Sequence, residues 1–390
     1  MKRCLAGLVG CVIAMLLAAQ GPAAAQSDAE KVGAIVEGAW YGQVEGLDRP
    51  DRYLEILAVE PAAGGFTATV LFGWADGPVS PAPARVTLEN DSVSLAFTAR
   101  TGASLRVRFD GTSAAQGTYQ MGRPPERKIA YRRLTERAEF EALNGVWSAT
   151  RNQQTRIFDI KRVVGNEDGV VIAIGQFGIV EDPSSIRQLV ATVDGDPGQA
   201  RLRWQTGATA GDLRRTKPDE LSGTFSVAAA PGAKAAADPI VFHPASAAAA
   251  GKVGGAVIEV GRPFPDLQLV TIGGKRVRPA DFRGKTVLVS FFQSWDVWSL
   301  DELKAFRVAK ARYGDRIVIL TVNYGMSGSD RVPPKPGADR SGIEAFTTPE
   351  PVAVKRLPSN WVIDANGIVI ERINYMPAHT LLALLDKMVK

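Results

Sequence analysis

Hydrophobic and polar side chains alternate along much of the first 246 residues. In the segments 93–97 and 105–109 every second residue is a large apolar one, and this period of two predicts strands that bury one face. Runs rich in Gly, Pro and Asp separate such segments, as in 76–83, and they predict turns. The region is therefore expected to form antiparallel β structure.

The same region repeats itself. Four short motifs recur in the same order at separations of 104 to 111 residues: Gly38-Ala39-Trp40 with Gly145-Val146-Trp147, 52–56 with 156–160, 117–119 with 223–225, and 128–131 with 239–242. A near-constant separation predicts a tandem repeat. We expect β module 1 at 27–138 and its repeat, β module 2, at 139–246.

Each module is expected to be a compact antiparallel barrel or sandwich. The Gly-x-Trp opening of each copy is similar to that of small lipocalin-like barrels. Trp40 and Trp147 are interpreted as plugs at the ends of the two cores rather than as ligand contacts.

The pattern changes after an Ala- and Gly-rich linker at 247–256, a composition typical of flexible connections. From 257 to 390, apolar runs alternate with segments of helical period, which predicts an α/β domain. The predicted strands are 286–292, 317–322, 361–363 and 368–370, and the predicted helices are 299–314 and 381–388. The expected architecture is two tandem antiparallel β modules followed by this α/β domain.

The first 25 residues have the layout of a secretory signal peptide. Lys2 and Arg3 precede an apolar stretch at 5–19, and Ala23-Ala24-Ala25 offers a cleavage site before Gln26,. The stretch is shorter than the ~20 residues that a spanning helix needs. We expect a periplasmic or secreted protein. The segment ending at Cys11 also resembles a lipoprotein processing site, so the membrane would be a partner only if Cys11 were lipidated.

The remaining composition excludes several classes of function. A net charge of +5 over 390 residues, with no block of Lys and Arg, does not predict a nucleic-acid surface,. The two histidines, His243 and His379, fall in different predicted domains, so the sequence predicts neither a zinc site nor a Ser–His–Asp triad. No metal and no cofactor is expected.

Several segments of the last domain carry a family resemblance. In chain order they are 260–265, 281–285 before the central strand, Trp295 at the end of that strand, Glu302, and Arg356-Leu357-Pro358 followed by 361–364. The domain resembles the TlpA-like thiol–disulfide reductases and redoxins (AhpC/TSA-like) of the thioredoxin superfamily. The resemblance implies a thioredoxin-like fold in which Pro358 occupies the place of the family's cis-proline.

The chain departs from this family at the reactive site. Where the family has two cysteines separated by two residues, the sequence has Asp296 and Ser299. Its two cysteines, Cys4 and Cys11, both lie in the predicted leader. Thiol–disulfide exchange requires a thiolate, so we interpret Asp296 and Ser299 as residues that start a helix, with Ser299 and Glu302 forming a capping box.

The surroundings of these positions suggest a binding site. Trp295 and Trp298 flank the helix start, and Leu357 and Pro358 are expected beside it. In thioredoxin folds the backbone next to the cis-proline pairs with extended peptides, so an exposed Trp298 would suit a protein or peptide partner. The alternative is that Trp298 folds inward or packs against the β modules.

These features predict an exported cell-envelope protein whose thioredoxin-like domain is redox-inactive and acts in protein binding, scaffolding or chaperoning. Enzyme activity is not predicted. Three alternatives stay open: a thioredoxin-family oxidoreductase, an enzyme that uses Asp296 or Ser299 for another chemistry, and a protein whose β repeats bind a small ligand or glycan.

Overall fold

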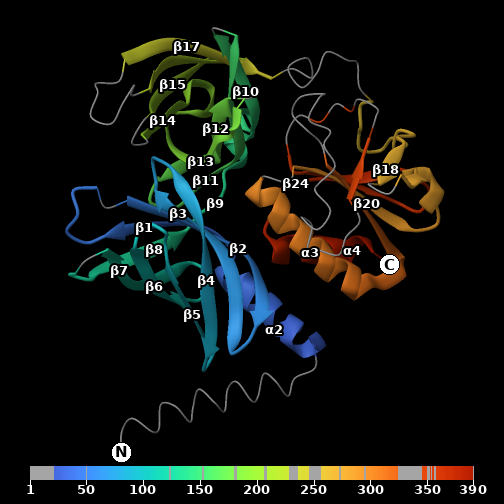
Figure 1. Cartoon of the computed structure of the whole chain (residues 1–390), viewed down its shortest axis with the longest axis horizontal. Coiled ribbons are helices and arrows are strands. Elements are labelled where there is room, and N and C mark those ends of the chain that lie inside the picture. Colours follow the sequence, from blue (N-terminus) through green and yellow to red (C-terminus); the bar gives the residue numbers. More distant parts are fainter. Residues whose placement is uncertain are drawn as a thin grey trace, which may run out of the picture.

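A computed structural model describes residues 22–49, 51–122, 124–151, 153–179, 182–205, 209–227, 236–245, 256–271, 274–293, 296–323, 345–348, 352, 354 and 357–389. The two β barrels are neighbours, and the C-terminal domain packs against both of them (Figure 1). The predicted linker at 247–256 lies, except for Ala256, outside the described residues, as do residues 1–21 of the predicted leader.

The first module is a closed ring of eight antiparallel strands. Each strand pairs with the next one along the chain, and the first closes the ring against the last. The strands are β1 (Gly38–Val44), β2 (Asp51–Ala62), β3 (Gly65–Trp74), β4 (Val79–Glu89), β5 (Ser92–Thr98), β6 (Ala103–Asp110), β7 (Ala114–Met121) and β8 (Arg127–Arg133). The alternating segments 93–97 and 105–109 fall within β5 and β6, as predicted.

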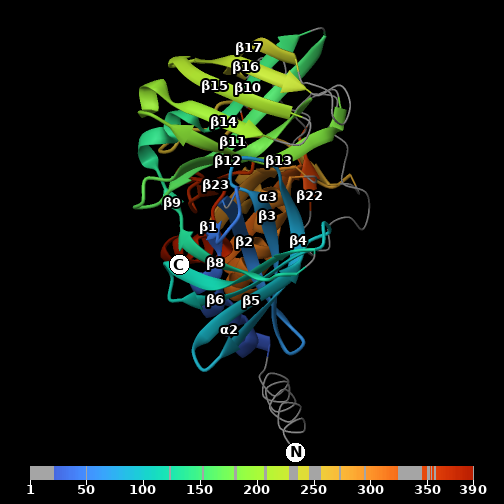
Figure 2. The ribbon, with the colours of Figure 1, turned by 90° about the vertical axis from the view of Figure 1, so that its left-hand side faces the viewer.

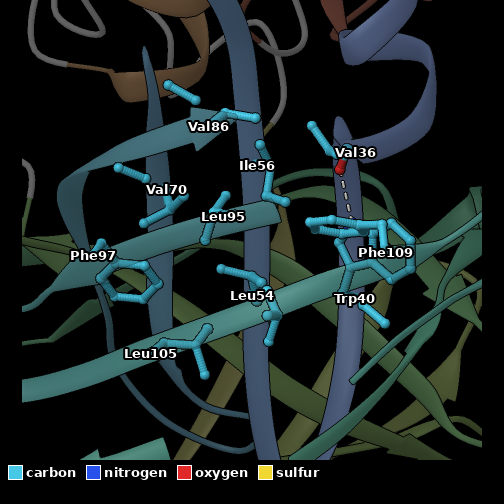
Figure 3. Packing of buried hydrophobic residues seen from close by; sticks show 14 of the residues in the cluster. Val36, Trp40, Leu54, Ile56, Val70, Val86, Leu95, Phe97, Leu105 and Phe109 are labelled. Carbon is cyan, nitrogen blue, oxygen red and sulfur yellow. Dashed lines mark hydrogen bonds between the residues drawn. The ribbon is translucent and has the colours of Figure 1, made fainter. Parts of the chain in front are cut away.

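Large apolar side chains fill the interior of this first barrel. Trp40 is fully buried and meets the Phe109 ring edge-on, with ring centroids 5.1 Å apart (Figure 3). Its indole Nε1 donates a 2.8 Å hydrogen bond to the carbonyl of Val36, the last residue of helix α2 (Pro22–Val36). The sequence pattern did not predict this helix, which lies against β2.

The second module repeats this arrangement. Its strands are β10 (Gly145–Arg151), β11 (Gln154–Gly165), β12 (Val171–Ile179), β13 (Asp182–Asp194), β14 (Arg201–Gln205), β15 (Thr209–Lys217), β16 (Glu220–Val227) and β17 (Ala236–Pro244). The ring closes because β10 pairs with both β11 and β17, and β9 (Thr135–Glu136) extends the far end of β11. Both of the expected barrels are therefore present.

Matching contacts mark equivalent positions in the two barrels. Trp147 is buried, and its Nε1 donates to the carbonyl of Leu143 at 2.8 Å, as Trp40 does to a carbonyl four residues earlier. Gly117 and Gly223 also correspond, because each lies with its Cα against a backbone carbonyl of the neighbouring strand. A common origin of the modules by duplication stays a prediction from the sequence.

The C-terminal domain is a mixed sheet with helices on one face. Its strand order is β19-β18-β22-β21-β20-β23-β24, in which β20, β21 and β22 are parallel. The strands are β18 (Leu269–Thr271), β19 (Arg276–Val277), β20 (Thr286–Phe292), β21 (Ile317–Asn323), β22 (Ala345–Thr347), β23 (Ser359–Ile363) and β24 (Val369–Asn374). Helices α3 (Val297–Tyr313) and α4 (Ala378–Met388) cover one face.

Helices α3 and α4 lie between the sheet of the C-terminal domain and the first barrel (Figure 1). Helix α3 contacts β2, and α4 contacts both β2 and helix α2. One buried apolar cluster includes residues from both barrels together with Trp298 and Tyr375 of the C-terminal domain. The start of α3 is therefore an internal position of the whole molecule.

Candidate functional site

The central strand β20 ends next to the first turn of α3, at the positions where the sequence predicts a degenerate redox site. Asp296 is the residue before the helix, and its side chain accepts hydrogen bonds from the Ser299 amide at 3.1 Å and from the Ser299 hydroxyl at 2.6 Å. This is the geometry of a helix N-cap. Both residues are fully buried.

The predicted capping box of Ser299 and Glu302 is wrong. The helix begins at Val297, so Ser299 lies within its first turn and Asp296 makes the cap. The buried carboxylate of Glu302 instead accepts two hydrogen bonds from the side-chain amide of Asn360 on β23, at 3.0 and 3.2 Å.

A lysine from the second barrel reaches into this site. Lys161 lies on β11, where the pairing with β12 shifts by one residue between Ile160 and Arg162. Its ammonium group is 2.7 Å from the Asp159 carboxylate and 3.7 Å from that of Asp296, and it donates to the carbonyl of Leu357. One cation thus bridges the barrel, the helix cap and the residue before Pro358.

The bulge explains the direction in which the Lys161 side chain points. An extra residue in one strand turns consecutive side chains toward the same face. Phe158 and Ile160 belong to the core of the barrel, whereas Lys161 and Arg162 both make their contacts outside it. Two adjacent cations therefore face the C-terminal domain.

A second buried cluster of charged and polar groups, or node, joins the two barrels and the C-terminal domain. Glu55 of the first barrel, fully buried, forms an ion pair with Arg162 of the second. The other oxygen of Glu55 accepts from the Tyr53 hydroxyl at 2.9 Å and from the Trp298 indole at 3.2 Å. Each charge in this node has an opposite charge or a hydrogen-bond donor as a neighbour, as buried charges require.

The first barrel presents a similar bulge to the same helix. The register of β2 against β3 shifts between Ile56 and Val59, and the backbone amide of Ala58 donates to the Asp301 carboxylate at 2.9 Å. The other oxygen of Asp301 accepts from the Tyr375 hydroxyl at 3.2 Å. The two barrels thus hold the first turns of α3 from two sides.

Burial dominates the electrostatics of the carboxyl groups on α3. Desolvation raises the pKa of Asp301 to about 7 and that of Glu302 to about 8, because both lie away from water. It also raises the pKa of Asp296, against the opposing effects of Lys161 and Ser299. Burial acts to lower the pKa of Lys161, but Asp159 and Asp296 outweigh it, so the pKa is raised and the lysine is charged.

The structure brings together three of the four predicted binding residues and buries them. Trp298 is fully buried against the barrels, which is the second of the two alternatives for this residue, and Leu357 is 7% exposed. Pro358 is also buried, and the Leu357–Pro358 bond is cis. Trp295 lies outside the described residues.

The sequence analysis missed the partners of this site. Lys161 and Glu55 are 135 and 241 residues from Asp296, so no local pattern connects them. The available signal was the motif at 156–160, which continues into a Lys-Arg pair, whereas its copy at 52–56 continues into Leu57 and Ala58. A pair of charges that interrupts a strand of apolar period marks a bulge or an interface.

Two other kinds of site are absent from the described part of the chain. No group of three His, Cys, Asp or Glu residues there could hold a metal ion. None of the described helices combines the length and the apolar character needed to cross a membrane.

Comparisons with known proteins point to the C-terminal third. No family model matches the chain. It is 24% identical over 123 residues to the thioredoxin-like protein YneN of Bacillus subtilis, a match that covers 29% of this chain and 69% of that protein. This part of the chain is thus similar to thioredoxin-like proteins.

Solved structures give the same kind of match. The exposed lipoprotein thioredoxin Etrx1 of Streptococcus pneumoniae is 23% identical, covering 32% of this chain and 99% of that one with a TM-score of 0.27. The thioredoxin domain of a thiol-disulfide oxidoreductase from Bacteroides vulgatus is 19% identical, covering 34% and 99% with a TM-score of 0.29.

Proposed function

We propose that this is a non-catalytic cell-envelope protein in which the thioredoxin-like domain is redox-inactive and acts as a scaffold. The proposal starts from Asp296 and Ser299, which stand where thioredoxin-like reductases carry their cysteines. Neither side chain can form a mixed disulfide, because that step needs a thiolate attacking sulfur.

The observation that carries the proposal is the contact between Lys161 and Leu357. In thioredoxin folds, the backbone beside the cis-proline pairs with an extended partner chain. Here the carbonyl of Leu357 accepts its hydrogen bond from the lysine of a bulged strand in the same molecule. The domain therefore uses the region of its former substrate groove to hold its own second barrel.

This arrangement fixes where outside partners can bind. With Trp298 and Pro358 covered, a protein or peptide of the envelope would meet the exposed faces of the barrels. The C-terminal domain then determines how the two barrels are presented, and export to the periplasm provides the setting. Glycan or small-molecule binding inside the first barrel is not favoured, because aromatic and aliphatic side chains fill it.

The experiment that tests redox inactivity is insulin reduction. The purified protein, with dithiothreitol as reductant, should precipitate insulin no faster than buffer, while a thioredoxin with both cysteines should accelerate the reaction. A variant carrying Asp296→Cys and Ser299→Cys serves as the matched control for the site. Any acceleration by the wild-type protein above buffer would overturn the proposal.

A second candidate function, hydrolysis by Ser299, has one observation in its favour. The Asp296 carboxylate lies 2.6 Å from the Ser299 hydroxyl, within the reach of a general base. However, the same carboxylate caps the helix, and both residues are fully buried. A fluorophosphonate probe should leave Ser299 unlabelled; labelling that disappears in Ser299→Ala would establish the hydrolase instead.

A further inference from the structure

The outer face of the first barrel carries a shallow hollow over β4 to β7. It measures about 430 Å³, and its lining includes Arg85, Arg106 and Arg108 around a floor of small residues. All three arginine side chains are exposed. In Figure 2, β5 and β6 lie toward the viewer, on the side of the barrel away from the C-terminal domain.

The register of the strands places the backbone positions of the three arginines around Ala96. Arg85 on β4 and Arg106 on β6 both pair with Ala96 on β5, which lies between them. Strands in a sheet are about 4.8 Å apart, so these two arginines start about 10 Å from each other. Arg108 follows Arg106 on the same face, roughly 7 Å along the strand.

None of these arginines forms an ion pair with a carboxylate in the described part of the chain. Arg108 donates to the Ser92 hydroxyl at 2.6 Å, and Arg85 donates to the carbonyl of Gly64 at 3.2 Å. Neither contact neutralises charge. Three like charges that surround one spot on a sheet repel one another, and no described residue supplies a paired counter-charge.

On the second barrel, the equivalent face carries acidic residues that neutralise Arg201 and Arg203. Gly117 and Gly223 are equivalent, and they lie against the carbonyls of Arg106 and Asp212 respectively, so Asp212 stands where the first barrel has Arg106. Arg201 pairs with Asp212 at 2.7 Å (Nε–Oδ1). Arg203 pairs with Asp194 at 3.1 Å.

We propose that the hollow on the first barrel binds an anionic saccharide, a sugar chain that carries phosphate or carboxylate groups. The planar guanidinium fork binds both of these groups through paired hydrogen bonds. Three arginines whose backbone positions lie about 7 to 10 Å apart suit a ligand with several separated charges rather than a single ion.

The other lining residues favour a sugar over a nucleic acid. Ser94, Gln116 and Thr118 supply hydroxyl and amide groups that can hydrogen-bond to sugar hydroxyls,. The lining contains no aromatic side chain, and proteins that bind single-stranded nucleic acid stack bases on aromatic rings. The small floor at Ala96 and Gly117 lets a ring lie flat between the arginines.

Calorimetric titration of the purified protein tests this site. The probes are an oligogalacturonate, which carries carboxylates, a phosphorylated mannan oligosaccharide, a neutral maltooligosaccharide and a single-stranded DNA of similar charge. We expect one of the two anionic saccharides to bind, and the comparison between them identifies the anionic group. The neutral sugar should not bind.

Two matched variants locate the binding. Arg106→Asp copies the residue of the second barrel and should weaken binding at least about tenfold, the loss expected for a charge-assisted hydrogen bond. Arg214→Asp changes an exposed arginine of the second barrel in the same way and should alter affinity less than about twofold. The proposal is overturned if neither anionic saccharide binds, if both variants lose affinity equally, or if DNA binds as tightly as the saccharide.

Discussion

The two barrels have the same ring of strands but carry different chemistry on the outside. In each barrel a buried tryptophan bonds to a carbonyl four residues earlier, and a glycine lies against the backbone of the neighbouring strand. Outside, β2 has Leu57 and Ala58 at its bulge where β11 has Lys161 and Arg162. The comparison shows that interior positions determine the barrel, whereas outward positions determine what each barrel binds.

The outer faces of the two barrels also differ, in whether their charged residues are paired. The second barrel uses its bulge cations for buried contacts with Asp296 and Glu55, and its surface residues Arg201 and Arg203 are paired with carboxylates. The first barrel contacts α3 with neutral residues at its bulge, and among the described residues Arg85, Arg106 and Arg108 on its outer face form no ion pair. One copy is therefore specialised for internal assembly, and the other keeps its charges available.

The largest test of this comparison exchanges the residues at the bulge. Lys161→Leu gives β11 the residue that β2 has at the equivalent position and leaves the buried carboxylates of Asp159 and Asp296 without their cation. Removing one partner of a buried ion pair costs about 3–5 kcal/mol, which chemical denaturation would measure. Adding Asp159→Asn and Asp296→Asn should recover part of the loss; no recovery would contradict the role given to Lys161.

The pH dependence of the free energy of unfolding distinguishes the buried carboxyl groups of α3 from the exposed ion pairs on the barrel surfaces. Asp301 and Glu302 have pKa values raised to about 7 and about 8 by burial, so their protonated forms are favoured in the folded state. The stabilisation that these protonated groups give the folded state is complete below about pH 4, the ordinary carboxyl pKa. It is lost as the pH rises through 7 and 8. We expect the free energy of unfolding to fall by about 2–4 kcal/mol between pH 5 and pH 8.

The control for this pH dependence is Asp301→Asn with Glu302→Gln, which should flatten the profile. The exposed pairs of the second barrel have the opposite sign, because the hydrogen bond from Arg201 lowers the pKa of Asp212. Their contribution disappears only in acid, below the ordinary aspartate pKa. Stability that rose between pH 5 and pH 8 would contradict the burial of the α3 carboxyl groups.

Alanine at the paired glycines tests whether the interiors are equivalent. A Cβ at position 117 or 223 would lie 1.8 or 2.0 Å from a backbone oxygen, so the strands must separate. Gly117→Ala and Gly223→Ala should each cost about 1–3 kcal/mol, measured by thermal unfolding. Gly198→Ala, where nothing lies within 4 Å of the added atom, is the control, and unequal costs at 117 and 223 would weaken the correspondence.

The smallest effect on stability is expected from Asp212→Asn. Exposed ion pairs contribute little to folding, so the unfolding midpoint should stay unchanged. Combined with Asp194→Asn, the substitution leaves Arg201 and Arg203 without their carboxylate partners and gives the second barrel an arginine cluster like that of the first. Titration with the saccharide that binds the wild type should then reveal a second, weaker site; a single unchanged site would show that unpaired charge alone does not create one.

The sequence predicted the elements whose pattern is local. The alternation at 93–97 became β5, and the apolar run at 286–292 became β20 with the predicted bounds. Helix α2 was not predicted, because its apolar stripe is weak. The capping box predicted at Ser299 and Glu302 was wrong, since Asp296 three residues earlier makes the cap. Both Asp296 and Ser299 are residues that can cap a helix, and only the course of the backbone decides between them.

The contacts of the candidate site could not be predicted from the sequence. Trp298 and Glu55 are 243 residues apart, and Lys161 and Leu357 are 196 apart. Their meeting depends on how three modules pack, and the bulge that aims Lys161 is a shift of one residue in register. What the sequence did contain was a charged pair at 161–162 where the first copy has Leu57 and Ala58.

Closure of the two rings also determines where the molecule is open to strand addition. A closed barrel has no free strand edge, so neither ring can template another chain. Among the described residues, the sheet of the C-terminal domain ends at β19 and β24. Strand β19 is only two residues long, and β24 is longer, although its first residue, Val369, already exchanges two backbone hydrogen bonds with Gly261 and Arg262. Aggregation of partly unfolded chains would therefore be expected to start at β24, and charged substitutions there are the ones to choose for keeping the protein in solution.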